Sequence, residues 1–155
     1  MPRAMKLQVD WGEPIAMRLA SRQGSRYVAN LEGAPVTSGV YVFARAHGSA
    51  FEALYVGQAR NLRVRLEQQL NNLRLMEYIR EAKAGHRAIM VGALVTTRGQ
   101  KVDTCLPVIE RAFIRYFLAE GHHLANIHGA RRLMHEVRSR RRPMHFVPLT
   151  TYVDL

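Results

Sequence analysis

The chain has 155 residues, 48% of them apolar, and its 23 Lys and Arg against 12 Asp and Glu give a formal net charge of +11. This length suits one domain with a hydrophobic core, and the apolar content excludes a wholly disordered chain. No apolar run reaches the ~18 residues of a membrane span, and no secretory signal is evident. The single cysteine, Cys105, excludes an internal disulfide and a cysteine-based zinc site. We therefore expect a cytoplasmic protein, encoded by a bacterium or a phage, that has no membrane partner.

The positive charge is carried mainly by arginine. The planar guanidinium group matches phosphate oxygens, so this composition favours a polyanionic partner such as nucleic acid. Two alternatives stay open at this point: a basic protein without such a partner, and a protein that binds an acidic protein. The seven histidines show no spacing typical of a zinc site.

In chain order, residues 1–35 are expected to form an N-terminal extension with a short strand and a short helix. Residues 40–44 and 53–57 are rich in β-branched and aromatic side chains, which predicts two strands. The turn-forming sequence His47-Gly48-Ser49 lies between them, so the two strands are expected to form an antiparallel hairpin.

Helical periodicity follows from Asn61, a predicted N-cap, because leucines recur at steps of three and four residues. A second helix is expected over residues 75–84, a buried strand over 88–97, and a third helix from Pro107 to about Gly121. This order predicts an α+β fold with a small central antiparallel β-sheet flanked by helices. The domain would span residues 36–130, and a basic tail, residues 131–155, would pack on it or extend it.

Two tripeptides mark the predicted hairpin, Gly39-Val40-Tyr41 and Tyr55-Val56-Gly57. Together with the stretch 58–66 that follows, Glu110 and Asn126, they resemble the GIY-YIG nuclease family, which is named for two such tripeptides on adjacent strands. The resemblance covers about residues 38–128. It implies a metal-dependent endonuclease that hydrolyses phosphodiester bonds in DNA.

The resemblance also implies residue roles. Glu110 matches the glutamate that holds a single divalent cation, Mg²⁺ or Mn²⁺, and a hard carboxylate ligand suits such an ion. Arg65, ten residues after Tyr55, matches the arginine that faces the scissile phosphate. The ordinary alternatives are a surface ion pair for Glu110 and a solvated cation for Arg65. Arg63 and Arg65 cannot share a helix face, because two residues subtend about 200°.

Tyr41, Tyr55 and Asn126 complete the expected catalytic set. Tyr41 matches the tyrosine that activates or orients the attacking water, although a tyrosine pKa of about 10 is too high for a base unless its neighbours lower it. The alternative is that both tyrosines pack in the sheet and that Asn126 forms a turn. Gly57 is expected to be needed for its backbone freedom or to let a phosphate approach.

Gln69 departs from the family pattern. Many members have His or Tyr fourteen residues after the second motif tyrosine, where this chain has Gln69. Glutamine is not a base at neutral pH, so a mechanism that needs a proton acceptor here is in doubt. This departure supports a second hypothesis, a catalytically weak nucleic-acid-binding module that retains the fold.

Basic residues outside the catalytic set are expected to contact DNA phosphates, which would position the substrate without reading its sequence. They are Arg60, Arg63, Arg131, Arg132, Arg138, Arg140 and Arg141. Apolar residues interleave with the arginines of the tail and predict a helix there with one packed face. We expect no separate recognition domain in this chain, and therefore either limited intrinsic sequence specificity or specificity supplied by a protein partner or a homodimer. A third hypothesis, a protein-interaction or toxin-neutralising role, is disfavoured by the presence of a metal-ligand match.

Overall fold

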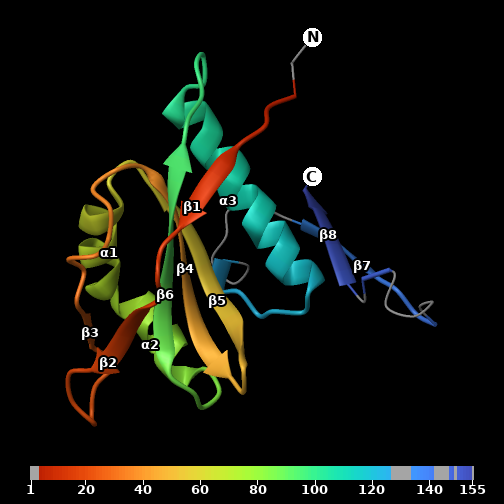
Figure 1. Ribbon diagram of the computed structural model, residues 1–155. Coiled ribbons are helices and arrows are strands. Elements are labelled where there is room, and N and C mark those ends of the chain that lie inside the picture. Colours follow the sequence, from red (N-terminus) through yellow and green to blue (C-terminus); the bar gives the residue numbers. More distant parts are fainter. Residues whose placement is uncertain (1–3, 127–133, 142–146, 149, 155) are drawn as a thin grey trace.

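Six strands form one antiparallel sheet of order β3-β2-β6-β4-β5 in the computed structural model of the protein (Figure 1). The structure describes residues 4–126, 134–141, 147–148 and 150–154. β1 pairs with β6 alongside β2. The strands of this sheet are β1 (Gln8–Trp11), β2 (Ile15–Leu19), β3 (Tyr27–Ala29), β4 (Gly39–His47), β5 (Ala50–Ala59) and β6 (Arg87–Val95). The described helices are α1 (Leu62–Leu70), α2 (Leu73–Glu81) and α3 (Val102–Ala119). The predicted α+β class is confirmed.

The β4–β5 hairpin is covered on both faces, which explains its nearly continuous apolar sequence. Alternate side chains point to opposite faces of a strand. Tyr41 and Phe43 therefore pack in one core cluster with α1 and α2, while Val40 and Val42 pack in a second cluster with α3. The sheet thus lies between a helix pair and a single helix, as Figure 1 shows.

The turn and the first two helices agree closely with what the sequence predicted. His47 pairs with Ala50 across the turn, and Gly48 adopts φ 62°, a left-handed conformation that glycine tolerates. Asn61 caps α1, because its side-chain oxygen accepts the Val64 N–H at 3.1 Å. Asn72 caps α2 in the same way. The second helix begins two residues earlier than expected.

The third helix was predicted to begin at Pro107, and this is wrong: α3 begins at Val102. Proline lacks an N–H and leaves the carbonyl four residues earlier without its helical partner. Here that carbonyl belongs to Asp103, in the exposed first turn, where water can bind it. The proline is therefore tolerated one turn inside the helix.

The expectation of a helix in residues 1–35 is also wrong, since these residues form three strands. β1 and β2 both pair with β6, through Val9↔Leu94 and Ala16↔Ala88. The N-terminal segment therefore belongs to the same sheet as the predicted domain.

The predicted helix of the tail is wrong for the residues the structure describes. Here β7 (Met134–Arg138) pairs antiparallel with β8 (Thr150–Asp154), and β8 contacts α3. Arg131 and Arg132 lie outside the described residues. The apolar residues Met134 and Val137 lie three positions apart, which is the helical spacing behind the prediction, and the local pattern does not show the pairing with β8.

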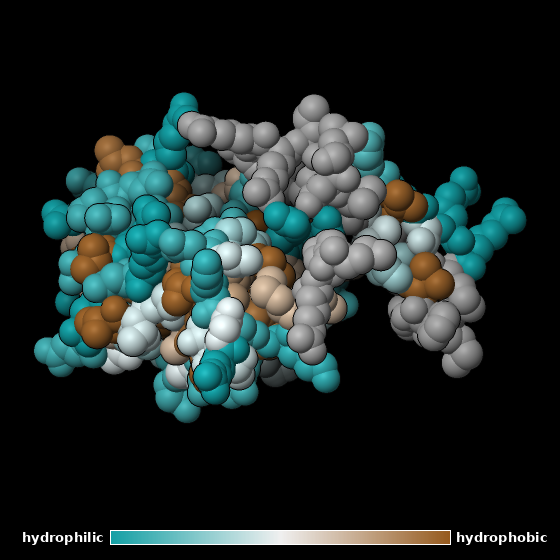
Figure 2. Space-filling model, turned by 90° about the horizontal axis from the view of Figure 1, so that it is seen from above, coloured by the Kyte–Doolittle hydropathy of each residue, from teal (hydrophilic) through white to brown (hydrophobic). Residues whose placement is uncertain are grey.

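Hydrophilic side chains predominate on the face shown in Figure 2, and the hydrophobic ones form separate patches. Among the described residues, no helix combines the length and apolar character that crossing a membrane requires.

Candidate active site

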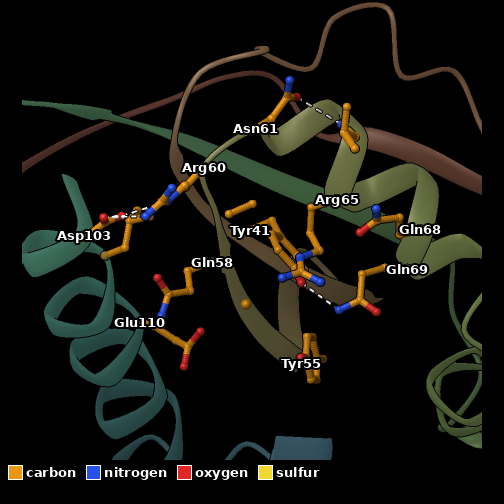
Figure 3. Close-up of a pocket in the computed structure, with 14 residues that line it drawn as sticks. Tyr41, Tyr55, Gln58, Arg60, Asn61, Arg65, Gln68, Gln69, Asp103 and Glu110 are labelled. Carbon is orange, nitrogen blue, oxygen red and sulfur yellow. Dashed lines mark hydrogen bonds and ion pairs between the residues drawn. The ribbon is translucent and has the colours of Figure 1, made fainter.

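A cleft of about 620 Å³ opens at the edge strand β5, where the two faces of the sheet meet. The hairpin contributes Tyr41, Tyr55 and Gly57 to its lining, and α1 contributes Arg65 and Gln69. From the other face, α3 contributes Asp103, Leu106 and Glu110. Figure 3 shows Arg65 beside Tyr41 and Glu110 across β5 from both. The hairpin, the helix α1 that follows it and the distant helix α3 therefore place polar groups around one space.

Gly57 makes room for the Tyr41 ring. The two residues pair directly across the hairpin, and a Cβ at position 57 would lie 2.2 Å from both Cζ and Oη of Tyr41. The ring thus lies against the backbone of β5, and its hydroxyl reaches the cleft. The geometry thus favours a use of Gly57, packing of Tyr41, that was neither of the two expected ones, backbone freedom and approach of a phosphate.

Tyr41 is 1% exposed, and burial is the main cause that raises the pKa of its hydroxyl well above 10. The charge of Tyr55 raises the pKa further, while the Gln69 hydrogen bond and the Arg65 charge lower it less. The neighbours therefore do not lower this pKa toward neutrality. With only the protein's own groups around it, the Tyr41 hydroxyl stays protonated at neutral pH and is a hydrogen-bond donor rather than a base.

Arg65 is exposed on α1 and points into the cleft, in reach of Tyr41 electrostatically. Arg63 points elsewhere, as the helical geometry requires: its guanidinium donates to the carbonyls of Ala34 at 3.0 Å and Glu32 at 2.8 Å. These bonds anchor the loop before β4 to α1. They favour a structural role for Arg63 over the expected contact with DNA.

Arg60 and Asp103 form a two-pronged ion pair at the rim of the cleft, with Arg60 Nε donating to Asp103 Oδ1 at 2.8 Å. Both side chains are largely exposed, at 76% and 65%. Arg60 is thus near the cleft, as expected, but an acidic side chain already engages two of its guanidinium nitrogens, Nε and Nη2.

Glu110 is half-buried on the cleft face of α3, and Gln58 lies beside it (Figure 3). The described residues include no cluster of three or more His, Cys, Asp or Glu. An ion that needs a full protein cage does not fit here. Mg²⁺ does fit, because it commonly takes one or two carboxylates and completes its shell with water and substrate phosphate.

Asn126 does not line the cleft. Its amide oxygen accepts the Val56 N–H at 2.9 Å, and its amide nitrogen donates to the Val56 carbonyl at 2.7 Å. The side chain thus pairs with the outer edge of β5 as a neighbouring strand would. Its hydrogen-bonding groups serve the backbone, which favours a structural role over the expected contact with water or a hydroxyl.

None of the tail arginines that the structure describes, Arg138, Arg140 and Arg141, lines the cleft. Arg138 forms an ion pair with Glu136, and Arg140 and Arg141 are exposed. Arg131 and Arg132 cannot be placed, because they lie outside the described residues.

Sequence reasoning missed Asp103 and Gln58, which both line the cleft. Asp103 precedes Glu110 by seven residues, or about two helical turns, so both face the cleft once α3 begins at Val102. The misplaced helix start concealed this spacing. His122 accepts the Ala53 N–H at 2.7 Å.

Comparison of the chain with models of protein families, with curated proteins and with solved structures found no match. The functional argument therefore depends on the residues and geometry of the cleft.

Proposed function

We propose that this protein is a metal-dependent endonuclease of the GIY-YIG type, which hydrolyses phosphodiester bonds in DNA. The observation that carries the proposal is the cleft at β5, where Tyr41, Tyr55, Arg65 and Glu110 come together from a hairpin and two helices on opposite faces of the sheet. These residues were selected because they match the motifs of the family that the chain resembles, and all four line the same cleft.

The chemistry of the four residues suits phosphodiester hydrolysis. Arg65 stays charged and offers parallel N–H donors to the non-bridging oxygens of a phosphate. The protonated hydroxyl of Tyr41 can orient a water molecule or a phosphate oxygen by donating a hydrogen bond. Glu110 would hold Mg²⁺ or Mn²⁺, which when bound neutralises developing charge and makes water more acidic. The net charge of +11 would attract the polyanionic substrate.

The first experiment is cleavage of a supercoiled plasmid in Mg²⁺ or Mn²⁺, with EDTA as one control. Glu110→Gln keeps the size of the side chain and removes its charge, whereas Glu13→Gln makes the same charge change at an exposed site outside the cleft. We expect the wild type and Glu13→Gln to cut, and Glu110→Gln to lose at least about a hundredfold in rate. Equal activity of the two variants would contradict the proposal.

The same gel separates one active site from two. Nicking alone indicates a monomer that cuts one strand, and direct linearisation indicates a homodimer or another arrangement that presents two sites.

The second candidate is a nucleic-acid-binding module without useful catalysis. Its support is the deeply buried Tyr41, whose pKa is raised, together with Gln69 in place of a side chain that could act as a base. A wild type that shifts DNA on a gel, releases it as salt rises and leaves it uncut would favour this candidate.

A further inference from the structure

Three side chains form a continuous chain of hydrogen bonds that leads away from the cleft wall: Tyr41 and Gln69, which line the cleft, and Asn72, which does not. We call these three residues the amide chain. Asn72 Nδ2 donates to Gln69 Oε1 at 3.1 Å, and Gln69 Nε2 donates to Tyr41 Oη at 2.7 Å. At its other end, Asn72 Oδ1 accepts the backbone N–H of Leu75 at 3.2 Å. The bond to Tyr41 is buried, whereas Asn72 is exposed at the start of α2.

The backbone fixes the direction of this chain. A backbone N–H can only donate, so Asn72 must present its oxygen to Leu75 and its amide nitrogen to Gln69. Gln69 then uses its oxygen toward Asn72 and its nitrogen toward Tyr41. Turning either amide over would set donor against donor at one of the three contacts, and an unsatisfied polar group of this kind costs roughly 1–3 kcal/mol.

The fixed direction determines where the hydroxyl hydrogen of Tyr41 can go. Gln69 Nε2 occupies the phenolic oxygen as a donor and offers no lone pair in return. Arg65, whose charge also reaches this hydroxyl, has no acceptor either. Tyr55 and Glu110, whose charges also reach this hydroxyl, do carry acceptor oxygens, and both line the cleft. The hydrogen of Tyr41 is therefore left for an acceptor in the cleft, which can be one of these side chains, a water molecule or a phosphate oxygen.

We propose that Gln69 and Asn72 are positioning residues that hold the Tyr41 hydroxyl with its hydrogen directed into the cleft. The catalytic part of this inference rests on the proposed nuclease function. In this arrangement Gln69 supplies a permanent donor, which a side chain that titrates near neutral pH would not. Asn72 acts at a distance, because it touches neither the cleft nor Tyr41.

Asn72→Asp reverses the amide chain with little change to the fold. Aspartate is as good an N-cap as asparagine, so the Leu75 N–H keeps its acceptor. The remaining carboxylate oxygen faces Gln69 and attracts its amide nitrogen. Gln69 then turns its oxygen toward Tyr41 and takes the hydroxyl hydrogen away from the cleft.

Asn71→Asp is the matched control. It makes the same charge change at the adjacent, exposed residue, and the Asn71 side chain contacts the carbonyl of Glu67 rather than Gln69. Melting temperatures establish that both variants fold.

Two measurements separate hydrogen-bond direction from catalysis. The first is the carbon-13 resonance of the tyrosine Cζ at fixed neutral pH, with Tyr41→Phe used to assign the Tyr41 signal. We expect this signal to shift in Asn72→Asp and to stay in place in Asn71→Asp. The second is kcat and KM for DNA cleavage, where we expect kcat to fall at least about tenfold in Asn72→Asp alone, with KM little changed.

Each result decides something. An unmoved Tyr41 resonance in Asn72→Asp overturns the fixed direction of the amide chain. A moved resonance with unchanged kcat overturns its positioning role in catalysis. If the wild type cuts no DNA, the proposed function fails and the catalytic role fails with it, while the resonance still decides the direction of the hydrogen bonds.

Discussion

At the scale of single residues, Gly57 determines whether Tyr41 can reach the cleft. We predict that Gly57→Ala lowers cleavage at least about a hundredfold, because a displacement near 1 Å of a reacting group can cost that much. The added methyl group, 2.2 Å from Cζ and Oη of Tyr41, also overpacks a buried site and costs roughly 1–3 kcal/mol of the free energy of unfolding.

Plasmid cleavage and urea denaturation measure the two effects of this substitution. Gly33→Ala is the control, since its Cβ would meet nothing within 4 Å and its backbone does not adopt a positive φ. Wild-type activity in Gly57→Ala would mean that the position of the Tyr41 ring is unimportant.

A second residue-scale prediction concerns Asp103, which occupies the guanidinium of Arg60 at the rim of the cleft. Asp103→Asn should free Arg60 for a phosphate and tighten DNA binding by up to about fivefold, because an exposed ion pair is worth at most ~1 kcal/mol. Fluorescence anisotropy at low salt measures the affinity. Glu13→Gln changes the net charge equally, so an equal gain in that variant would attribute the effect to charge alone.

At the scale of elements, the segment after α3 is held to the open edge of β5 by two side chains. His122 Nδ1 accepts the Ala53 N–H, and Asn126 pairs with the backbone of Val56. These two side chains bond to the backbone of the edge strand where a further strand would, and a covered edge is protected from pairing with another chain. Since β5 carries Tyr55 and Gly57, this attachment also supports the wall of the cleft.

The His122 contact predicts a dependence of stability on pH. Burial is the main cause that lowers the pKa of His122 below its ordinary 6.5, although the charges of Glu52 and Glu120 oppose it. Because the folded pKa lies below the unfolded one, the stabilisation is complete above about pH 6.5 and is lost as pH falls through the folded pKa. Only the neutral ring accepts the Ala53 N–H.

Urea denaturation at about pH 7.5 and about pH 5 tests this dependence. We expect His122→Asn to reduce the loss of unfolding free energy on acidification. We expect His86→Gln, at an exposed histidine that is not among the causes of the His122 pKa shift, to retain the wild-type loss. A His122→Asn protein with the full wild-type pH dependence would show that other groups cause it.

The sequence predicted the elements whose patterns are local. Asn61 lies at a helix start, and Gly48 lies in a tight turn, and both patterns depend on neighbouring residues alone. Residues 7–19 were misassigned in part, although apolar residues alternate at Leu7, Val9 and Trp11, which is the period of a strand. Their pairing with β6 joins segments about 80 residues apart in sequence, and no local pattern encodes that choice.

The candidate site shows the same division. The family resemblance selected Tyr41, Tyr55, Arg65 and Glu110, all of which line the cleft. It could not show that the Asn126 amide is engaged by a strand edge, nor that Asp103 faces Arg60, because both contacts depend on how α3 and the segment after it pack on the sheet.

At the scale of the whole molecule, the charge of +11 predicts how DNA binding depends on salt. The logarithm of affinity should fall linearly with the logarithm of salt concentration, with a slope of about −0.9 for each phosphate contacted. A slope close to zero would mean that no DNA phosphates are contacted, and it would favour the acidic protein partner that the composition left open.

The slope further tests whether the tail contributes to DNA binding. Replacing Arg138, Arg140 and Arg141 with Gln should reduce its magnitude by about 1–3 if these exposed arginines contact phosphates. Replacing Arg18, Arg22 and Arg98 with Gln makes an equal charge change at exposed positions outside the cleft. Equal slopes in the two triple variants would show that the tail adds only to overall charge, and DNA would then be held mainly around Arg65 at the cleft.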